Sequence, residues 1–189
     1  MYDHPATQEN IEILKARGAA FVGPAEGHLA SGLSGIGRML ETADILGHIR
    51  VLLGRNGPLA GRKVVITAGG TQEPLDPVRM LTNRSSGKQG YALAQSALEM
   101  GAQVTLITTP TALTPPVGAQ VTPVETAKQM LEAVLSESSK SDALIMAAPV
   151  ADFRPSNVTK DKVKKEGGIP QITLEATEDI LKTVAEQRP

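Results

Sequence analysis

The stretch from Lys63 to Gly90, KVVITAGGTQEPLDPVRMLTNRSSGKQG, constrains the fold of this chain more than any other part. It opens on Lys63 to Thr67, whose β-branched density is typical of a central parallel strand. The glycine pair Gly69 and Gly70 follows and removes side chains where a ligand would approach the backbone. The next helix is expected only near Ser86, and such long connections in compact domains are usually functional. This order predicts a phosphate-binding loop after a buried strand.

Strands and helices alternate regularly from this point. We expect strands at 62–68, 103–108 and 142–147, and helices at about 86–100 and 126–137. The pattern predicts an α/β fold, a doubly wound Rossmann-like domain with a mostly parallel sheet. Less regular elements complete the prediction: a loop over 109–123, a short strand at 172–174, and a last helix capped by Thr177, Glu178 or Asp179.

The residues before this domain form a separate part. We expect a helix at 5–17, a strand at 19–22, a loop over 23–38 and a helix at about 41–53. The segment from Gly54 to Gly61 is rich in turn-forming residues and lacks apolar periodicity, so it marks the best boundary. We therefore divide the chain into 1–57 and 58–189. The first part has no complete sheet and is not expected to fold alone.

Composition excludes several classes of function. Nineteen Lys and Arg against 20 Asp and Glu leave a formal charge of -1, so no net field attracts nucleic acid or an anionic membrane. Two Phe, two Tyr and no Trp leave few rings on which bases could stack. No apolar run is long enough to span a bilayer, and the start MYDHP is unlike a signal peptide. We expect a cytoplasmic protein.

Catalytic chemistry is limited by residue type. The chain has no cysteine, which excludes disulfides and thiolate chemistry. Its histidines, His4, His28 and His48, are scattered without metal-ligand spacing or a paired nucleophile. A zinc site or a Ser-His-Asp triad is therefore not expected. The kind of chemistry that the residue types still allow is electrostatic stabilisation of phosphate groups.

Two Gly-rich clusters are the first candidate site. Gly69, Gly70 and Thr71 match neither the spaced dinucleotide fingerprint nor a P-loop, so alone they are weak evidence. A second cluster lies at the expected helix start, where backbone N–H groups, two hydroxyls and an ammonium would converge on an anion. The alternative is an ordinary N-cap with a solvated lysine. This second cluster consists of Ser85, Ser86, Gly87 and Lys88.

The end of the third expected strand supplies further candidates. In open α/β sheets ligands bind beyond the carboxyl ends of the strands, so Met146, Ala147 and Ala148 should lie on the same edge as the glycine loop. For the two alanines alone, tight strand packing is the simpler interpretation. Asp152 could hold a metal that bridges phosphates or could cap a turn. Basic residues follow that could bind phosphate or be solvated: Lys160, Lys162, Lys164 and Lys165.

Four motifs, ITAGGTQEPLDPVR, LTNRSSGKQG, AAPVADFRP and DKVKK, occur in this order and spacing. Together they closely resemble the ligase half of the bifunctional phosphopantothenoylcysteine decarboxylase/phosphopantothenate-cysteine ligase family of coenzyme A biosynthesis. The first part, with MYDHPATQENIEILKARGAAFVGP and GHLASGLSGIGRM, is similar to the last part of the flavin-dependent decarboxylase in that family. The resemblance implies that 1–57 is a decarboxylase remnant and 58–189 the N-terminal part of a ligase domain.

The resemblance also implies an activity and its site. The ligase activates the carboxylate of 4'-phosphopantothenate with CTP and Mg²⁺, forms an acyl-cytidylate, and lets the amine of cysteine displace CMP. By similarity Asn83 stabilises the acyl-cytidylate, and Asp152 and Lys162 contact CTP. Asp152 is also the candidate metal ligand that its residue type suggests. The cytidine site would be lined by Met146, Ala147, Ala148, Glu178, Asp179, Ile180 and Leu181. We assign Gly69, Gly70, Thr71, Ser85, Ser86, Gly87 and Lys88 to phosphate contacts.

Two departures from the family pattern limit this expectation. Further nucleotide contacts, an aromatic residue and a lysine pair among them, would come from sequence beyond Pro189, so we expect an incomplete CTP site. In the decarboxylase half, Ser31 stands where the family has a proton-donating cysteine, and a hydroxyl is a far weaker acid than a thiol. We expect no stable FMN binding and no decarboxylation by this chain. Family members suggest a homodimer through the ligase domain and a larger homo-oligomer in the full-length parent.

Two other interpretations stay open. A non-catalytic α/β module could use the same edge to bind a dinucleotide or a phosphate. A dinucleotide module should carry an acidic residue at the end of the second strand, where this chain has Thr108, Thr109 and Pro110. The chain could also be an inactive structural remnant.

Overall fold

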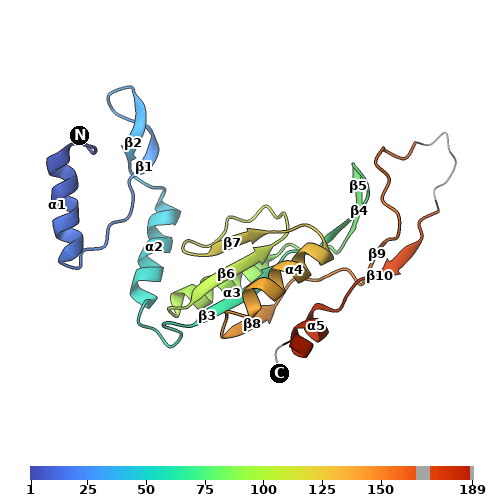
Figure 1. The fold of residues 1–189 in the computed structure, drawn as a ribbon. Coiled ribbons are helices and arrows are strands. Elements are labelled where there is room, and N and C mark those ends of the chain that lie inside the picture. Colours follow the sequence, from blue (N-terminus) through green and yellow to red (C-terminus); the bar gives the residue numbers. More distant parts are fainter. Residues whose placement is uncertain (165–170, 188–189) are drawn as a thin grey trace. The chain divides into compact units, whose positions relative to one another are not determined.

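The computed structural model describes residues 1–164 and 171–187 and divides into two compact units, Met1–Arg50 and Val51–Pro189. The border lies within helix α2 (Thr42–Gly54). Figure 1 shows the order of the elements along the chain. Each unit is described by itself below.

The first unit contains one helix and one hairpin before α2. Helix α1 spans Pro5–Ala16, close to the expected helix. The expected strand at 19–22 is wrong, because these residues have no strand partner and Phe21 is exposed. Strands β1 (Ala25–His28) and β2 (Ser34–Arg38) instead pair antiparallel inside the expected loop. Their sequences AEGH and SGIGR lack the apolar alternation that marks a strand, and backbone pairing alone defines them.

The second unit is built on a four-stranded parallel sheet. Its strands are β3 (Lys63–Ala68), β6 (Gln103–Thr108), β7 (Gln120–Pro123) and β8 (Ala143–Met146), in the order β7-β6-β3-β8. Ile66 of β3 is paired with Leu106 of β6 and with Ile145 of β8. The expected mostly parallel, Rossmann-like sheet is confirmed. Strand β7 was not expected, because it lies in the proline-rich 109–123 segment and has no buried residue.

Helices cover both faces of this sheet, as a doubly wound fold requires. Helix α3 (Lys88–Glu99) packs Ala94 and Leu98 against Val64, Ile66 and Leu106. Helices α4 (Ala127–Ser138) and α5 (Ile180–Gln187) pack against the opposite face through buried residues that include Val65, Ile107, Met130, Val134 and Val184. Alternate residues of β3 therefore serve two cores, which explains its unbroken apolar sequence.

Helix α3 lies unusually close to the sheet at Gly90. A Cβ at this position would lie 2.6 Å from the Cβ of Ala68 and 2.7 Å from the carbonyl oxygen of Thr67. Only a residue without a side chain allows this approach.

Helix α3 begins at Lys88, two residues later than expected.

Two antiparallel two-stranded ribbons lie beyond the carboxyl ends of the sheet strands (Figure 1). Strands β4 (Gln72–Asp76) and β5 (Arg79–Thr82) form a hairpin where a loop was expected over 69–85. Strands β9 (Phe153–Pro155) and β10 (Leu174–Ala176) form the second ribbon, so the strand expected at 172–174 begins at Leu174. In β4 the buried positions are Glu73 and Asp76, which apolar periodicity cannot reveal.

Candidate functional site

The candidate residues gather where the strand order of the sheet reverses. The chain passes from β3 outward to β6 and β7 and then returns to β8 on the other side of β3. Ligands of open α/β sheets bind at such a switch point, beyond the carboxyl ends of the two strands. Here these ends lead into Gly69–Gly70 and Ala147–Ala148. The end of β8 lines two hollows in the described part of the chain.

The first hollow, which we call the α3 groove, has a volume of about 650 Å³. It brings the second Gly-rich cluster next to the end of β8, whereas Gly69, Gly70 and Thr71 of the first cluster are not part of its lining. Basic Arg84 and Lys88 lie at one wall and the apolar strand end at the other. Its lining is Arg84, Ser85, Ser86, Gly87, Lys88, Gln89, Leu93, Ile145, Met146, Ala147, Ala148 and Pro149.

The second hollow, the α5 pocket, has a volume of about 320 Å³. It contains nearly all residues that the resemblance assigns to cytidine, from two segments more than 25 positions apart in sequence. Met146 and Ala148 line both hollows, so both hollows reach the β8 end. The lining of the pocket is Met146, Ala148, Val150, Ala151, Asp152, Thr177, Glu178, Asp179, Ile180 and Leu181.

Hydrogen bonds of Thr177 hold the two walls of the α5 pocket together. Its N–H donates to the Asp152 carbonyl at 2.9 Å, and its hydroxyl donates to the Ala151 carbonyl. Asp179 caps α5, because its carboxylate accepts from the Lys182 N–H at 3.0 Å. This confirms a cap at the expected place. Ile180 is buried in the core below α5, whereas Leu181 is 58% exposed, so Leu181 offers the larger apolar surface to the pocket.

One glycine from each of the two clusters allows close backbone packing. Gly69 has φ +77°, and a Cβ there would lie 2.1 Å from the Thr109 hydroxyl oxygen. Gly87 has φ +73°, and its Cβ would lie 3.3 Å from the Gly69 nitrogen. Both positions require glycine, because the backbone is left-handed there and because a Cβ would be too close to a neighbouring chain segment. These positions set the shape of the edge, whatever ligand it takes.

The two serines before α3 hold the start of that helix. The Ser85 hydroxyl accepts from the Gly87 N–H at 3.3 Å, and the Ser86 hydroxyl accepts from the Lys88 N–H at 3.5 Å. Lys88 itself is exposed in the α3 groove. The N-cap of α3 is Gly87, which has no side-chain cap hydrogen bond, so the alternative of an ordinary N-cap is wrong. The phosphate contact of these residues stays a prediction.

Thr71 and Asn83 both contact the segment after β8. The fully buried Thr71 hydroxyl accepts from the Ala151 N–H at 2.9 Å, and the Thr71 N–H donates to the Pro149 carbonyl at 3.3 Å. The exposed Asn83 donates its side-chain N–H to the same Pro149 carbonyl at 3.5 Å. Asn83 thus lies beside the α3 groove with its amide oxygen available to a ligand. Thr71 holds residues 149–151 in place through its two hydrogen bonds.

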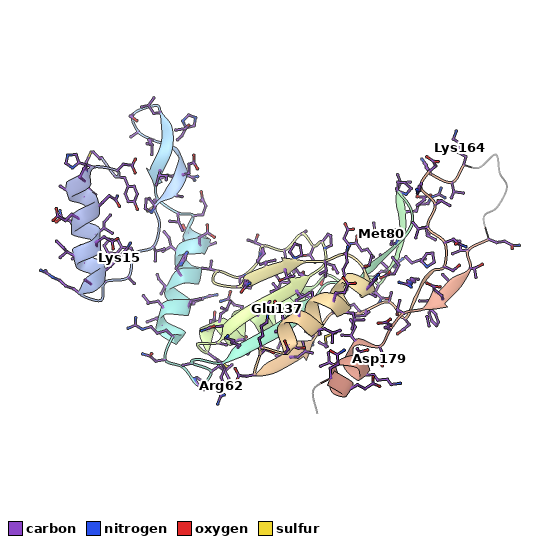
Figure 2. The ribbon with its side chains drawn as sticks, in the orientation of Figure 1. Lys15, Arg62, Met80, Glu137, Lys164 and Asp179 are labelled. Carbon is purple, nitrogen blue, oxygen red and sulfur yellow. The ribbon has the colours of Figure 1, made fainter. Side chains whose placement is uncertain are left out.

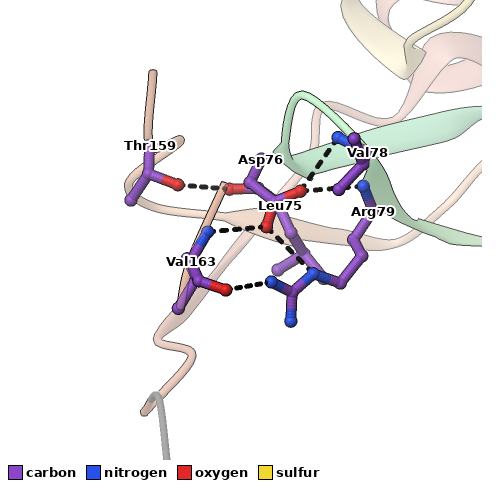
Figure 3. A network of polar contacts seen from close by, with 6 residues as sticks. All are labelled: Leu75, Asp76, Val78, Arg79, Thr159 and Val163. Carbon is purple, nitrogen blue, oxygen red and sulfur yellow. Dashed lines mark hydrogen bonds and ion pairs between the residues drawn. The ribbon is translucent and has the colours of Figure 1, made fainter. Parts of the chain in front are cut away.

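Lys162 does not line either hollow. It follows Thr159, whose hydroxyl donates to the Leu75 carbonyl at 3.4 Å, on a segment bound to the β4–β5 hairpin (Figure 3). Figure 2 shows Lys164 of the same segment at the outer end of the extension, away from Asp179. Lys165, the last of the four lysines, lies outside the described residues. The CTP contact of Lys162 stays a prediction.

Asp76 organises this attachment. Its carboxylate accepts from the N–H groups of Val78 and Arg79 at 2.9 Å each, from Arg79 Nε at 2.9 Å, and from the Val163 N–H at 3.2 Å (Figure 3). Burial by itself would raise the pKa of Asp76, but these donors and the Arg79 charge outweigh it and hold the pKa below its ordinary value of 3.8. An ionised carboxylate therefore joins the hairpin to residues 159–163.

Sequence reasoning missed three residues that shape the site: Asp76, Arg79 and Thr67. All three lie in or beside the quoted motifs, yet a buried carboxylate or hydroxyl gives no periodic signal. Thr67 accepts from the N–H groups of both Ala147 and Ala148 at 3.1 Å. It could have been suspected as a polar residue at the end of a buried strand.

The remaining sequence expectations concern Ser31, metals and membranes. Ser31 lies in the exposed turn between β1 and β2. Within residues 1–164 and 171–187, no three His, Asp or Glu side chains gather as a metal site. No helix of the described part combines the length and apolar character needed to cross a membrane.

Comparisons with known proteins place the second unit in a family. Residues 59–189 match the model of the DNA/pantothenate metabolism flavoprotein C-terminal domain. The chain is 47% identical over 191 residues to the Coenzyme A biosynthesis bifunctional protein CoaBC of Bacillus subtilis, covering 100% of this chain and 47% of the relative. The protein of that name from Vibrio vulnificus is 42% identical over 194 residues, covering 100% of this chain and 48% of the relative. The chain spans about half the length of the curated relatives it matches.

Solved structures agree with this placement. The C-terminal domain of a Coenzyme A biosynthesis bifunctional protein CoaBC superposes with a TM-score of 0.60 at 46% identity, over 68% of this chain and 60% of that one. The DNA/pantothenate metabolism flavoprotein from Streptococcus pneumoniae gives a TM-score of 0.60 at 26% identity, over 68% and 66%. The chain belongs to the family of the DNA/pantothenate metabolism flavoprotein C-terminal domain.

Proposed function

We propose that this chain carries part of the active site of a ligase of coenzyme A biosynthesis. The ligase would join 4'-phosphopantothenate to L-cysteine at the expense of CTP. One observation supports this most strongly: the α3 groove, with basic and hydroxyl groups, and the α5 pocket, with an apolar and acidic lining, meet at Met146 and Ala148. A nucleoside triphosphate has a base and a phosphate chain that need two such adjacent environments.

The proposed reaction has two steps. A carboxylate oxygen of 4'-phosphopantothenate attacks the α-phosphorus of CTP, an O–P bond forms, and the bond to the β-phosphate breaks to release pyrophosphate. The cysteine amine then attacks the acyl carbon, a C–N bond forms, and the C–O bond to CMP breaks while the amine loses a proton. Neither step needs a side-chain nucleophile. Fixed donors near the developing negative charge are the main requirement.

The described residues can supply the groups that these two steps require. Ser85, Ser86 and Lys88 at the start of α3 would stabilise phosphate charge, because a helix N-terminus and an ammonium both favour anions. Asn83 would donate to the acyl-cytidylate the second N–H of its amide, the one that does not bond to Pro149. Asp152 is exposed at the α5 pocket and is suited to a Mg²⁺ ion held mainly by the triphosphate. Bound Mg²⁺ would neutralise phosphate charge.

The wider assignments follow from the same resemblance. We propose that the complete gene product containing this sequence also decarboxylates 4'-phospho-N-pantothenoylcysteine with FMN, works in the cytoplasm, and forms a larger homo-oligomer that contains a homodimer through the ligase domain. The bifunctional names of the relatives support the first point. Light scattering on the purified gene product tests the dimer, and a monomer at micromolar concentration would contradict it.

Pyrophosphate release tests the ligase proposal. The complete gene product should release pyrophosphate from CTP only when 4'-phosphopantothenate is present, and should form the cysteine amide after cysteine is added. The 189-residue chain should be measured beside it. If the gene product binds CTP but releases no pyrophosphate, a non-catalytic binding module is the better interpretation.

A further inference from the structure

The buried hydroxyls of Thr67 and Thr71 bond to the segment that lines both hollows. Each residue has 0% of its surface exposed. Thr67 Oγ1 accepts from the N–H groups of Ala147 and Ala148, each at 3.1 Å. Thr71 Oγ1 accepts from the Ala151 N–H at 2.9 Å. Three backbone N–H groups of residues 147–151 therefore donate hydrogen bonds to two side chains, one from β3 and one from the loop after it.

These bonds begin where the sheet ladder stops. The last paired residues of β3 and β8 are Thr67 and Met146. Beyond Met146 the backbone N–H groups no longer have a strand carbonyl to bond, and a buried N–H without a partner is unfavourable. The Thr67 hydroxyl replaces that carbonyl for two successive residues. It also donates to the Met146 sulfur at 3.7 Å, which uses its proton.

The consequence is a fixed backbone path through residues that face both hollows. Ala147 and Ala148 line the α3 groove, and Ala148 and Ala151 line the α5 pocket. Their side chains are methyl groups, so the position of the backbone decides what shape a ligand meets. Neither threonine lines either hollow, so neither would touch the nucleotide itself.

We propose that Thr67 and Thr71 are positioning residues that set the affinity for the nucleotide by holding residues 147–151 in place. The proposal deepens the CTP-dependent function above and rests on it. It also revises the role that the sequence suggested for Thr71, from a phosphate contact to a support behind the loop. A substitution that removes either hydroxyl should therefore weaken nucleotide binding and leave the rates of the chemical steps nearly unchanged.

The test compares Thr67→Val, Thr67→Ser and Thr108→Val in the complete gene product. Valine keeps the shape of threonine and removes the hydroxyl, whereas serine keeps the hydroxyl. Thr108 is the matched control, since it is 7% exposed, ends the neighbouring strand β6, and bonds to Tyr91 and to the Thr109 carbonyl instead of residues 147–151. The readouts are pyrophosphate release as a function of CTP concentration and deuterium uptake of the peptide containing Ala147 and Ala148.

We expect Thr67→Val to raise the KM for CTP about tenfold or more while kcat changes less than about threefold, because two backbone donors lose their acceptor. The same variant should exchange the Ala147 and Ala148 amides faster. Thr67→Ser should restore both readouts, and Thr108→Val should move neither. Thr71→Val should raise the KM for CTP less, since it frees a single N–H.

An unchanged KM with unchanged exchange in Thr67→Val would overturn the proposal, as would an equal rise in KM for Thr108→Val. Absence of CTP-dependent pyrophosphate release by the unmodified gene product is a separate failure, that of the ligase assignment. Deuterium uptake would in that case still decide whether Thr67 holds the loop, since it needs no turnover.

Discussion

The side-chain amide of Asn83 donates to the backbone carbonyl of Pro149 at 3.5 Å, so a residue after strand β5 and a residue after strand β8 meet at the edge of the α3 groove. The two positions are 66 residues apart in sequence. The contact is long for an N–H···O bond, which leaves the amide free to turn toward a ligand. Asn83 is thereby placed next to both the phosphate side and the β8 side of the proposed site.

Asn83→Ala should abolish product formation by the complete gene product while CTP affinity stays within about threefold, since an interaction made mainly with the reacting group lowers kcat. Single-turnover formation of the acyl-cytidylate and CTP titration calorimetry measure the two effects. Asn157→Ala is the control, an exposed asparagine outside both hollows. An equal loss of CTP binding would instead assign Asn83 a structural role.

Asp76→Asn should weaken the attachment of the hairpin to residues 159–163 at neutral pH. The folded-state pKa of Asp76 lies below its ordinary value of 3.8, so its contribution to stability is present above that value and is lost as the pH falls through the folded-state pKa. The urea midpoint of Asp76→Asn should fall below that of the unmodified protein at neutral pH, and the difference should narrow toward about pH 3. Asp161→Asn, an exposed carboxylate of the same segment, should show little difference at either pH. A difference that widened in acid would refute this account.

Gly90→Ala should destabilise the protein by about 1–3 kcal/mol, because the new Cβ would overlap the strand below it. The clash is with the Cβ of Ala68 and the carbonyl oxygen of Thr67, which are held by the sheet and cannot move easily. Chemical denaturation gives the free energy of unfolding. Gln89→Ala, one position earlier in the same helix and exposed, should change it far less. Equal stability of Gly90→Ala and the unmodified protein would show that α3 can shift outward without cost.

The 189-residue chain should purify without bound flavin and should not decarboxylate. Ser31 occupies an exposed turn between β1 and β2, and a serine hydroxyl cannot replace a thiol as a proton donor at neutral pH. The visible absorption spectrum of the purified chain tests the first point directly. A yellow protein with the spectrum of bound flavin would prove the expectation wrong, and added FMN serves as the positive control for detection.

The main elements of the second unit could be predicted because each carries a local signal. The β-branched residues of β3, β6 and β8 and the apolar faces of α3 and α4 gave their positions to within two residues or so. The hairpins β1–β2 and β4–β5 could not be predicted in this way. The paired positions of β1–β2 include glycines, and the buried positions of β4 are Glu73 and Asp76, whose carboxylates accept hydrogen bonds from residues distant in sequence. Glu73, for example, accepts from the Ala127 N–H at the start of α4, 54 residues away.

The sequence by itself determined the parallel α/β architecture, the candidate residues after β3 and β8, and the family to which they belong. Only the tertiary structure decided which of these residues share a surface. It joined Ser85–Lys88 to Ala147–Ala148 in the α3 groove and Asp152 to Glu178–Leu181 in the α5 pocket, and it bonded Thr159 and Val163, on either side of Lys162, to the β4–β5 hairpin. The physical reason is that apolar periodicity reports burial one element at a time. Polar contacts such as those of Thr67 with Ala147 and Ala148 depend on strand order and register, which exist only in the folded sheet.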